Sequence, residues 1–294
     1  MADTANWMRD LSDDTRLDAI MMPGSHDAGM SELHHCAPPI GAGGKTQTQS
    51  LSVGKQLEAG ARYFDIRVDY DYKRLVTYHR TDGWGCNGQD LAPILDQLRD
   101  FLKAHPRETA ILKFSHIRDY GSSHKPAETK RLINDLLNAY PGLLYTNATG
   151  SVNLATVTLG QVRGKAILVF DYAEYINTAT GRFRYHDGAA AGQNIVVYDV
   201  YSDTSDYEEM KTNQLEKWGK YGGTGKGYLF LLSWTLTAST FSPSVEKMAE
   251  EANGKLPGVL QTQIKTRGWA KPNIVYIDYV NAVTCSAIIG YNFA

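Results

Sequence analysis

The stretch KAILVFDY (165–172) is apolar without interruption from Ala166 to Phe170 and then turns polar at Asp171. A short apolar run without polar alternation is typical of a strand that is buried on both faces, as in a parallel sheet. Seven further runs of similar character lie along the chain: LDAIMMPG (17–24), ARYFDIRV (61–68), RLVTYH (74–79), TAILKFSH (109–116), NIVVYDVY (194–201), YLFLLSW (228–234) and NIVYIDYV (273–280).

Helical patterns lie between several of these runs. Segments 91–106 and 128–142 have apolar residues at helical spacing and end at or near a proline, and 205–220 and 244–252 are weaker candidates. Buried strands that alternate with helices favour a parallel sheet, and eight of them in 294 residues predict a TIM-type (β/α)₈ barrel. We therefore expect residues 1–294 to form one α/β barrel domain.

One unit of this barrel is irregular. Only DYDYK (69–73) separates the second run from the third, which is too short for a crossover helix. The barrel is therefore predicted to be distorted, with a helix missing between its second and third strands. A doubly wound sheet is the alternative, but no glycine-rich turn between a strand and a helix marks a nucleotide site.

The composition excludes some classes of partner. The formal net charge of −2 and the absence of Lys/Arg clusters argue against nucleic acid. No apolar run approaches the roughly 20 residues of a membrane span. The first twenty residues lack the apolar segment of a signal peptide. We expect a secreted chain whose leader is absent from this sequence, or otherwise a cytoplasmic one.

Three cysteines are present, and their spacing fits no zinc motif. Cys36 and Cys86 both lie in loop-like, glycine-rich surroundings, where they could form a disulfide or remain unpaired; Cys285 is the third. The redox compartment therefore stays undecided.

Polar side chains gather where the apolar runs end. In a parallel barrel, functional residues sit at the C-terminal ends of the strands. Charged groups at such positions are costly unless they are paired or used, so we expect one shared site. The run ends supply His26, Asp27, Asp65, Arg67, His79, Lys113, Asp171, Asp199, Tyr201, Trp234 and Asp278.

Two of the eight histidines stand out. His26 lies in the turn PGSHDAG beside a carboxylate, and His79 ends a run before a polar, glycine-rich loop. Asp65 and Arg67 are two residues apart, so they share one face of a strand, either as a structural ion pair or as an anion site. Two imidazoles and a fixed cation suit phosphodiester cleavage by general acid–base catalysis.

A metal site is less favoured by the same residues. His26, Asp27, Asp65 and Asp278 could bind a cation, but Arg67 on the same face already supplies positive charge where a metal would lie. We therefore expect no cofactor, with calcium as the disfavoured possibility.

The order of these residues resembles that of bacterial phosphatidylinositol-specific phospholipase C. The resemblance rests on WMRDLSDDTRLDAIMMPGSHDAG, ARYFDIR, the run ending at His79, ILKFSH, VVYDVY and IVYIDYV, and it covers most of the chain. It implies cleavage of phosphatidylinositol to diacylglycerol and inositol 1,2-cyclic phosphate, which a slower second step hydrolyses.

The resemblance also implies the role of each residue. His26 would be the general base, oriented by Asp278, and His79 the general acid, helped by Asp27. Arg67, positioned by Asp65, would stabilise charge on the phosphorus. The substrate-binding residues would be Lys113, Asp199, Tyr201 and Trp234.

Arginine at position 67 and lysine at position 113 follow the metal-free pattern of this superfamily, whose calcium-dependent members carry acidic ligands there. One departure concerns the headgroup: the family often has a basic side chain where this chain has Asp171, so Arg182 or Arg184 would have to replace it. Trp84, in the loop after His79, either contacts a membrane or packs on the barrel rim.

Two other functions remain open. One is a different phosphodiesterase on the same barrel, acting on glycerophosphodiesters or sphingomyelin. The other is an inactive inositol- or sugar-binding barrel. If the chain is such a phospholipase C, we expect a monomer that binds phosphatidylinositol, or a glycosyl-phosphatidylinositol anchor, at a membrane surface.

Overall fold

Eight parallel strands close into a barrel in the computed structural model, which describes residues 3–38, 42–81, 84–118, 126–188 and 194–293. The first barrel strand pairs with the last strand of the chain on one side and with the second barrel strand on the other, so the ring has no open edge. The predicted TIM-type barrel is confirmed. Its strands are β1 (Met22–Ser25), β3 (Tyr63–Asp71), β6 (Ala110–Arg118), β7 (Ala166–Phe170), β8 (Arg182–Asp187), β9 (Ile195–Tyr198), β10 (Leu229–Trp234) and β11 (Ile274–Ile277).

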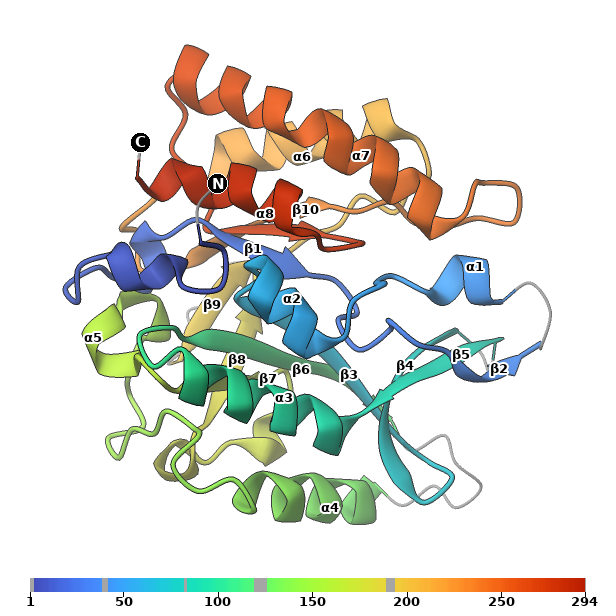
Figure 1. The fold of residues 1–294 in the computed structure, drawn as a ribbon, viewed down its shortest axis with the longest axis vertical. Helices are drawn as coiled ribbons and strands as arrows, with labels where there is room; N and C mark the ends of the chain where they lie inside the picture. Colours follow the sequence, from blue (N-terminus) through green and yellow to red (C-terminus); the bar gives the residue numbers. More distant parts are fainter. Residues whose placement is uncertain (1–2, 39–41, 82–83, 119–125, 189–193, 294) are drawn as a thin grey trace.

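Helices surround this barrel (Figure 1). The four segments predicted as helices are all helical, and each begins within two residues of its predicted start. The last of them, α7, is stabilised at its start because the Ser244 hydroxyl accepts a hydrogen bond from the amide of Lys247. The helices are α1 (Gly43–Thr46), α2 (Val53–Ala59), α3 (Leu91–Ala104), α4 (Pro126–Asn138), α5 (Leu159–Val162), α6 (Tyr207–Tyr221), α7 (Val245–Leu260) and α8 (Ala282–Ile289).

The third predicted run is not a barrel strand. It forms β4 (Arg74–Thr81), which pairs antiparallel with β3 from Val68↔Thr77 to Asp71↔Arg74. No helix separates the second run from the third, as predicted, because a tight hairpin joins two antiparallel strands and no crossover is needed. The prediction that the barrel lacks a helix between its second and third strands is wrong, because these strands are β3 and β6 and α3 lies between them. The next barrel strand along the chain is β6, which follows α3.

One barrel strand, the fifth along the chain, comes from a segment that the sequence pattern did not single out. Strand β8 has the sequence RFRYHD (182–187), in which charged and apolar residues alternate. Such a pattern does not resemble a doubly buried strand, and the connection before it contains only the short 3₁₀ turns Ala173–Tyr175 and Thr178–Thr180. The barrel is therefore irregular around β8.

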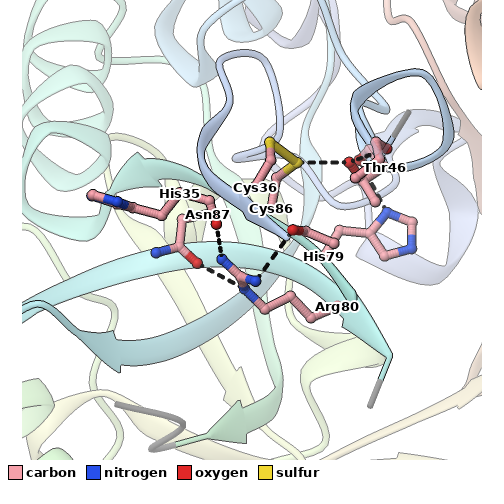
Figure 2. Close-up of a disulfide and its surroundings, with 9 residues drawn as sticks. His35, Cys36, Thr46, His79, Arg80, Cys86 and Asn87 are labelled. Carbon is pink, nitrogen blue, oxygen red and sulfur yellow. Dashed lines mark hydrogen bonds between the residues drawn. A yellow bond between two sulfur atoms is a disulfide. The ribbon is translucent and has the colours of Figure 1, made fainter. Parts of the chain in front are cut away.

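Three antiparallel strands extend the sheet beyond the barrel (Figure 1). Strand β5 (Trp84–Asp90) pairs with β4, and the short β2 (His34–Ala37) pairs with β5. A disulfide joins Cys36 of β2 to Cys86 of β5 (Figure 2), which decides between the two possibilities for these cysteines; Cys285 is free and buried.

None of the helices in the described ranges combines the length and hydropathy that are needed to cross a bilayer. The interior of the barrel and the layer beneath the helices form one large apolar core. A second, much smaller cluster lies under α1 and consists of Met30, Ala42 and Cys86, with Leu33 and Cys36 packed against it. The extension is thus anchored by few apolar contacts.

Candidate active site

His26 follows β1 directly, at the C-terminal end of the barrel. Its amide donates a 3.1 Å hydrogen bond to a carbonyl of β11, and Asp27 then turns the chain with a φ of 41°. A Cβ atom on Gly29 would lie 2.2 Å from Oγ1 of Thr77, so only glycine lets this turn pack against β4. The turn therefore brings His26 and Asp27 next to the strand that carries His79.

Three charged side chains surround the imidazole of His26. Its Nδ1 atom lies 2.8 Å from Oδ1 of Asp278, and its Nε2 atom lies 3.3 Å from Nη2 of Arg67 and 3.5 Å from Oδ2 of Asp27. Because a carboxylate only accepts, the Nδ1 atom of His26 carries a proton. The Nε2 atom is the one left to exchange a proton with a bound molecule.

Asp27 lies between the two histidines. Its Oδ2 atom is 3.5 Å from Nε2 of His26 and also 3.5 Å from Nδ1 of His79. The two imidazole rings are 6.4 Å apart between centroids. A group of atoms about the size of a phosphate could therefore contact both rings at once.

Arg67 is held by two buried carboxylates. Its Nε atom lies 2.5 Å from Oδ1 of Asp27 and 3.1 Å from Oδ2 of Asp65. Asp65 also accepts hydrogen bonds of 2.9 Å from the hydroxyls of Ser115 and Tyr276. These contacts fix the guanidinium in place before any anion arrives, which is the condition for electrostatic stabilisation without reorganisation.

His79 comes from outside the barrel, on the antiparallel strand β4. Its Nδ1 atom lies 3.0 Å from the carbonyl oxygen of Thr46, which is the last residue of α1. A carbonyl only accepts, so Nδ1 of His79 carries a proton and Nε2 is left for the cavity. About a quarter of the His79 side chain is exposed, similar to the fifth of His26.

The surrounding charges shift the pKa values of the two histidines in opposite directions. Burial disfavours the charged form of His26, but Asp27 and Asp278 outweigh it and raise the pKa of this imidazole to about 9. Burial, together with the neighbouring cations Arg67 and His26, lowers the pKa of His79 below its usual value, although Asp27 opposes this effect. In the free protein His26 holds its proton more tightly than His79 does.

Arg67 remains charged in spite of its burial. Burial lowers the pKa of the guanidinium, but Asp27 and Asp65 more than compensate and raise it. Arg67 in turn is the main charge that offsets burial at Asp65 and holds the pKa of that carboxyl below its usual value. The pair therefore supplies a permanent cation with an ionised carboxylate behind it.

A second ion pair joins β6 to the end of β9: Lys113 lies on β6 beside Asp65 of β3, and Asp199 follows β9. Nζ of Lys113 is 2.8 Å from Oδ2 of Asp199, and the Tyr185 hydroxyl donates to the same oxygen at 3.0 Å. Lys113 also lies 4.4 Å from the centroid of the Tyr185 ring. Burial lowers the pKa of Lys113, but Asp199 more than compensates and raises it, so Lys113 stays charged. Each offers hydrogen-bonding capacity toward hydroxyl groups.

These side chains line one cavity of about 600 Å³ at the C-terminal end of the barrel. The structure thus brings together most of the strand-end residues that the sequence predicted for a common site. Among the predicted residues, those that line the cavity are His26, Asp65, Arg67, His79, Lys113, Asp199, Tyr201 and Asp278, with Asp27 buried behind His26.

Among the described residues, one group of side chains could hold a metal ion. Ligand atoms of His26, Asp27 and Asp65 lie within 4.8 Å of one another. The guanidinium of Arg67 contacts both carboxylates of this group, so it stands where a bound cation would have to lie.

Trp234 is misplaced in the sequence-based prediction. It is 1% exposed, donates from Nε1 to the carbonyl of Ala252 at 2.8 Å and stacks edge-on against Tyr207. The side chain points into the layer between β10 and the surrounding helices, because successive residues of a strand face opposite sides. Its neighbour Ser233 lines the cavity instead.

The predicted replacements for the missing basic side chain also lie elsewhere. Arg184 contacts Asp171 at 3.3 Å and the carbonyl of Phe170, and Arg182 donates to Thr180 and Asn138. Asp171, Arg182 and Arg184 are absent from the cavity wall, so no basic group of that strand pair faces a bound headgroup.

Several site residues were not predicted. Ser115 and Tyr276 each lie two positions from a predicted residue, Lys113 and Asp278, so the twofold period of a strand could have identified them. Asp187 lies at the end of β8, which the pattern missed. Thr46 reaches the site through a backbone carbonyl, for which no sequence signal exists.

Comparison with known proteins gives a consistent result. No family model matches the chain. The 1-phosphatidylinositol phosphodiesterase of Listeria monocytogenes is 29% identical over 296 residues, which cover 98% of this chain and 85% of that enzyme. The relationship therefore extends over nearly the whole sequence.

Solved structures show the same fold. The phosphatidylinositol-specific phospholipase C of Listeria monocytogenes superposes with a TM-score of 0.70 at 24% identity, with 98% of each chain covered. A structure of the Staphylococcus aureus enzyme, from work on its membrane binding, gives 0.73 at 24% identity over 98% of this chain and 97% of that one. The resemblance read from the sequence is confirmed: the chain is a homologue of the bacterial phosphatidylinositol-specific phospholipases C.

Proposed function

We propose that this protein is a phosphatidylinositol-specific phospholipase C, which cleaves phosphatidylinositol to diacylglycerol and inositol 1,2-cyclic phosphate. The observation that carries the proposal is the placement of two imidazoles, 6.4 Å apart, on either side of Asp27 and beside the buried cation Arg67. One base, one acid and one fixed cation are the groups that an internal phosphoryl transfer needs.

In the first step His26 acts as the base. Nε2 of His26 takes the proton of the inositol 2-hydroxyl, whose oxygen attacks the phosphorus. Asp278, bonded to Nδ1 at 2.8 Å, holds the ring and stabilises the imidazolium that forms. The same contact raises the pKa of His26, so the neutral base is a minor species near neutral pH.

His79 acts as the acid. Its Nε2 atom donates a proton to the glycerol oxygen as the bond from this oxygen to phosphorus breaks, and diacylglycerol leaves. The lowered pKa of His79 makes this group a strong proton donor whenever it is charged. In a second, slower step the roles reverse: His79 takes a proton from water, whose oxygen attacks the phosphorus, and His26 returns a proton to the 2-oxygen as its bond to phosphorus breaks.

Arg67 supplies the charge that the phosphoryl group requires. Its position between Asp27 and Asp65 favours a mechanism without a metal, because a calcium ion would have to displace the guanidinium from both carboxylates. We therefore propose that no metal ion takes part.

The headgroup would lie against Lys113 and Asp199, which hydrogen-bond inositol hydroxyls, with Tyr201 over the ring. Tyr201 lines the cavity and is 59% exposed before anything binds. Asp187 also lines this side. The mixture of one cation and two carboxylates favours a neutral polyol over a headgroup with additional phosphates.

Apolar side chains at the cavity mouth favour contact with a membrane. Phe241 is 97% exposed in the segment between β10 and α7, and Val200, Tyr201 and Trp84 are exposed at the rim. Apolar and aromatic groups at such a rim would enter the interfacial region of a bilayer and place the cavity over a headgroup. The disulfide favours action outside the cytosol.

The test is phosphorus NMR of phosphatidylinositol vesicles incubated with the protein, with and without EDTA. We expect the cyclic phosphate signal first, followed by inositol 1-phosphate, at equal rates in both samples. His26→Ala and His79→Ala should each abolish the signal.

Other results would contradict specific parts of the proposal. Loss of activity in EDTA with recovery in calcium would refute the metal-free mechanism. Cleavage of glycerophosphodiesters or sphingomyelin but not of phosphatidylinositol would refute the substrate. Binding of inositol without turnover of any of these would indicate a binding protein.

A further inference from the structure

The disulfide lies close to the proposed acid, and the connection between the two is short. Cys86 stands directly opposite His79 in the β4–β5 pair, and its Sγ atom lies 3.3 Å from Oγ1 of Thr46. The carbonyl oxygen of Thr46 in turn accepts the hydrogen bond from Nδ1 of His79 at 3.0 Å. Figure 2 shows Thr46 between the disulfide and the imidazole of His79, joined to each by a dashed line.

The residues on either side of Thr46 also anchor α1: Nζ of Lys45 donates to the carbonyl of Ser242 at 2.5 Å, and Nε2 of Gln47 donates to the carbonyl of Ser31 at 3.0 Å. Helix α1 has four residues, and an isolated turn of this length is not stable in water. The hydroxyl of Thr46 has a single proton, and the carbonyl of Ala42 at 2.9 Å is a better acceptor than sulfur. The 3.3 Å contact with Cys86 is therefore mainly a packing contact, and it supports α1 on the side of the disulfide.

The cluster beneath α1 is built around the disulfide. Its buried members are Met30, Ala42 and Cys86, and Cys36 packs against them. Strand β2, which brings Cys36, pairs with β5 only at His34↔Asn87 and Ala37↔Gly85, with an irregularity between them. Without the covalent bond, this small cluster would lose its central contact and β2 would be held by few interactions.

Arg80 provides a second brace on the same edge. Its guanidinium donates to the carbonyl of His35 at 2.5 Å and to Oδ1 of Asn87 at 3.1 Å (Figure 2). Because Arg80 lies on β4, these bonds tie β4 to β2 and to β5, and they do not touch Thr46. The disulfide thus differs from the brace in its direct contact with the residue that orients His79.

We propose that the Cys36–Cys86 disulfide is a positioning device for the general acid: through Thr46 it holds His79 with Nδ1 occupied and Nε2 directed at the leaving oxygen. The inference rests on the proposed function. It assigns the disulfide a part in protonation of the leaving group and none in binding the headgroup or activating the 2-hydroxyl, because His26, Arg67 and Lys113 all come from barrel strands or their ends.

Substrates with different leaving groups can distinguish a role in positioning His79 from a general loss of structure. A strongly basic alkoxide must be protonated as it departs, whereas a weakly basic nitrophenolate departs without help. Two water-soluble substrates would be compared, glycerophospho-myo-inositol and 4-nitrophenyl myo-inositol 1-phosphate, so that membrane docking does not enter. The double variant Cys36→Ser/Cys86→Ser would be assayed on both.

We expect kcat on the glycerol substrate to fall about 10- to 100-fold and kcat on the nitrophenyl substrate to change less than about threefold. His79→Ala should give the same pattern with a larger loss, and the combined variant should lose no more than His79→Ala alone. Equal losses on both substrates, or no loss on either, would overturn the proposal.

Two further variants guard against misfolding. Leu98→Ala, in the core beneath α3, destabilises the barrel without touching β2 or β5 and should leave the ratio of the two rates unchanged. Thr46→Ala keeps the disulfide and the carbonyl but removes the side-chain contact with Cys86; if the double variant does not fold, this variant should still lower the rate on the glycerol substrate more than the rate on the nitrophenyl substrate.

A measurement without turnover separates this inference from the proposed function. In ¹⁵N spectra of the imidazole, His79 of the wild type should show a protonated Nδ1, and the double variant a mixture of tautomers. If the wild type cleaves neither substrate, the proposed function fails and this spectrum alone decides: an unchanged tautomer would overturn the positioning role.

Discussion

Nδ1 of His26 lies 2.8 Å from Oδ1 of Asp278, although 252 positions separate the two residues in the sequence. The contact exists because β1 pairs in parallel with β11, so that the first and last barrel strands end side by side. A histidine buried between Asp278 and Asp27 is held in its charged form, and its pKa rises to about 9. The proposed base is thus oriented at the cost of being mostly protonated at neutral pH.

The first prediction concerns the pH dependence of kcat/KM on a soluble substrate. In the proposed mechanism the active form has neutral His26 and charged His79, so below the lowered pKa of His79 the rate should rise with pH as His26 loses its proton. Between the two pKa values the gain in neutral His26 cancels the loss of charged His79, which gives a plateau. Above about 9 the rate falls. A single sharp optimum near pH 5 would contradict this assignment.

Replacing Asp278 with Asn tests which histidine controls each limb. Loss of the carboxylate should lower the pKa of His26 from about 9, so the descending limb moves to lower pH while the ascending limb stays. The plateau rate should fall about 100-fold or more because the ring loses its orientation. Asp171→Asn is the control, since Asp171 ends a strand outside the cavity; a shift of the ascending limb instead would reverse the assignment.

The Lys113–Asp199 pair should affect headgroup binding and stability together. Lys113→Met leaves Asp199 with Tyr185 as its remaining partner, which we expect to cost about 2 kcal/mol in the free energy of unfolding. On a soluble substrate KM should rise about tenfold with a smaller change in kcat. Lys113→Met/Asp199→Asn should recover part of the stability in urea titrations but not the KM; an unchanged KM in both would remove the pair from the headgroup site.

Phe241 should matter only at a membrane. Phe241→Ser removes a 97% exposed aromatic side chain from the segment between β10 and α7, both ends of which line the cavity, and we expect vesicle affinity to fall about tenfold in a sedimentation assay. Turnover of a soluble substrate should stay unchanged. Phe293→Ser is the control, because Phe293 is also exposed but follows Asn292, which bonds to Met21 at the opposite end of β1. Equal effects of both variants would argue against docking through the mouth.

The barrel could be predicted because most of its strands are buried on both faces. Runs such as AILVF in β7 are typical of a strand buried on both faces. When such strands are parallel, the polar residues that follow them lie together at the C-terminal end of the barrel. The prediction went wrong at β4 and β8. Strand β4 is apolar enough to look like a barrel strand, whereas β8 alternates because Arg184 and His186 face away from its buried residues.

The site was predictable to the extent that its residues lie at strand ends. His26, Arg67 and Lys113 were found in this way, and His79 was found although its strand was misassigned. The prediction that Trp234 binds substrate was wrong, because a place at the end of a strand does not show whether the side chain faces the cavity or the surrounding helices. The disulfide could not be decided, since nothing in the sequence shows that β2 returns to pair with β5.

The proposed acid and base belong to different structural layers. His26 follows a strand of the closed ring, whereas His79 lies on the hairpin that extends outward from β3. The ring would then recognise and activate the headgroup half of a diester, and the hairpin would serve the half that departs. Such a division of labour is modular: a different hairpin on the same ring could adapt the enzyme to another leaving alcohol without disturbing how the sugar is held.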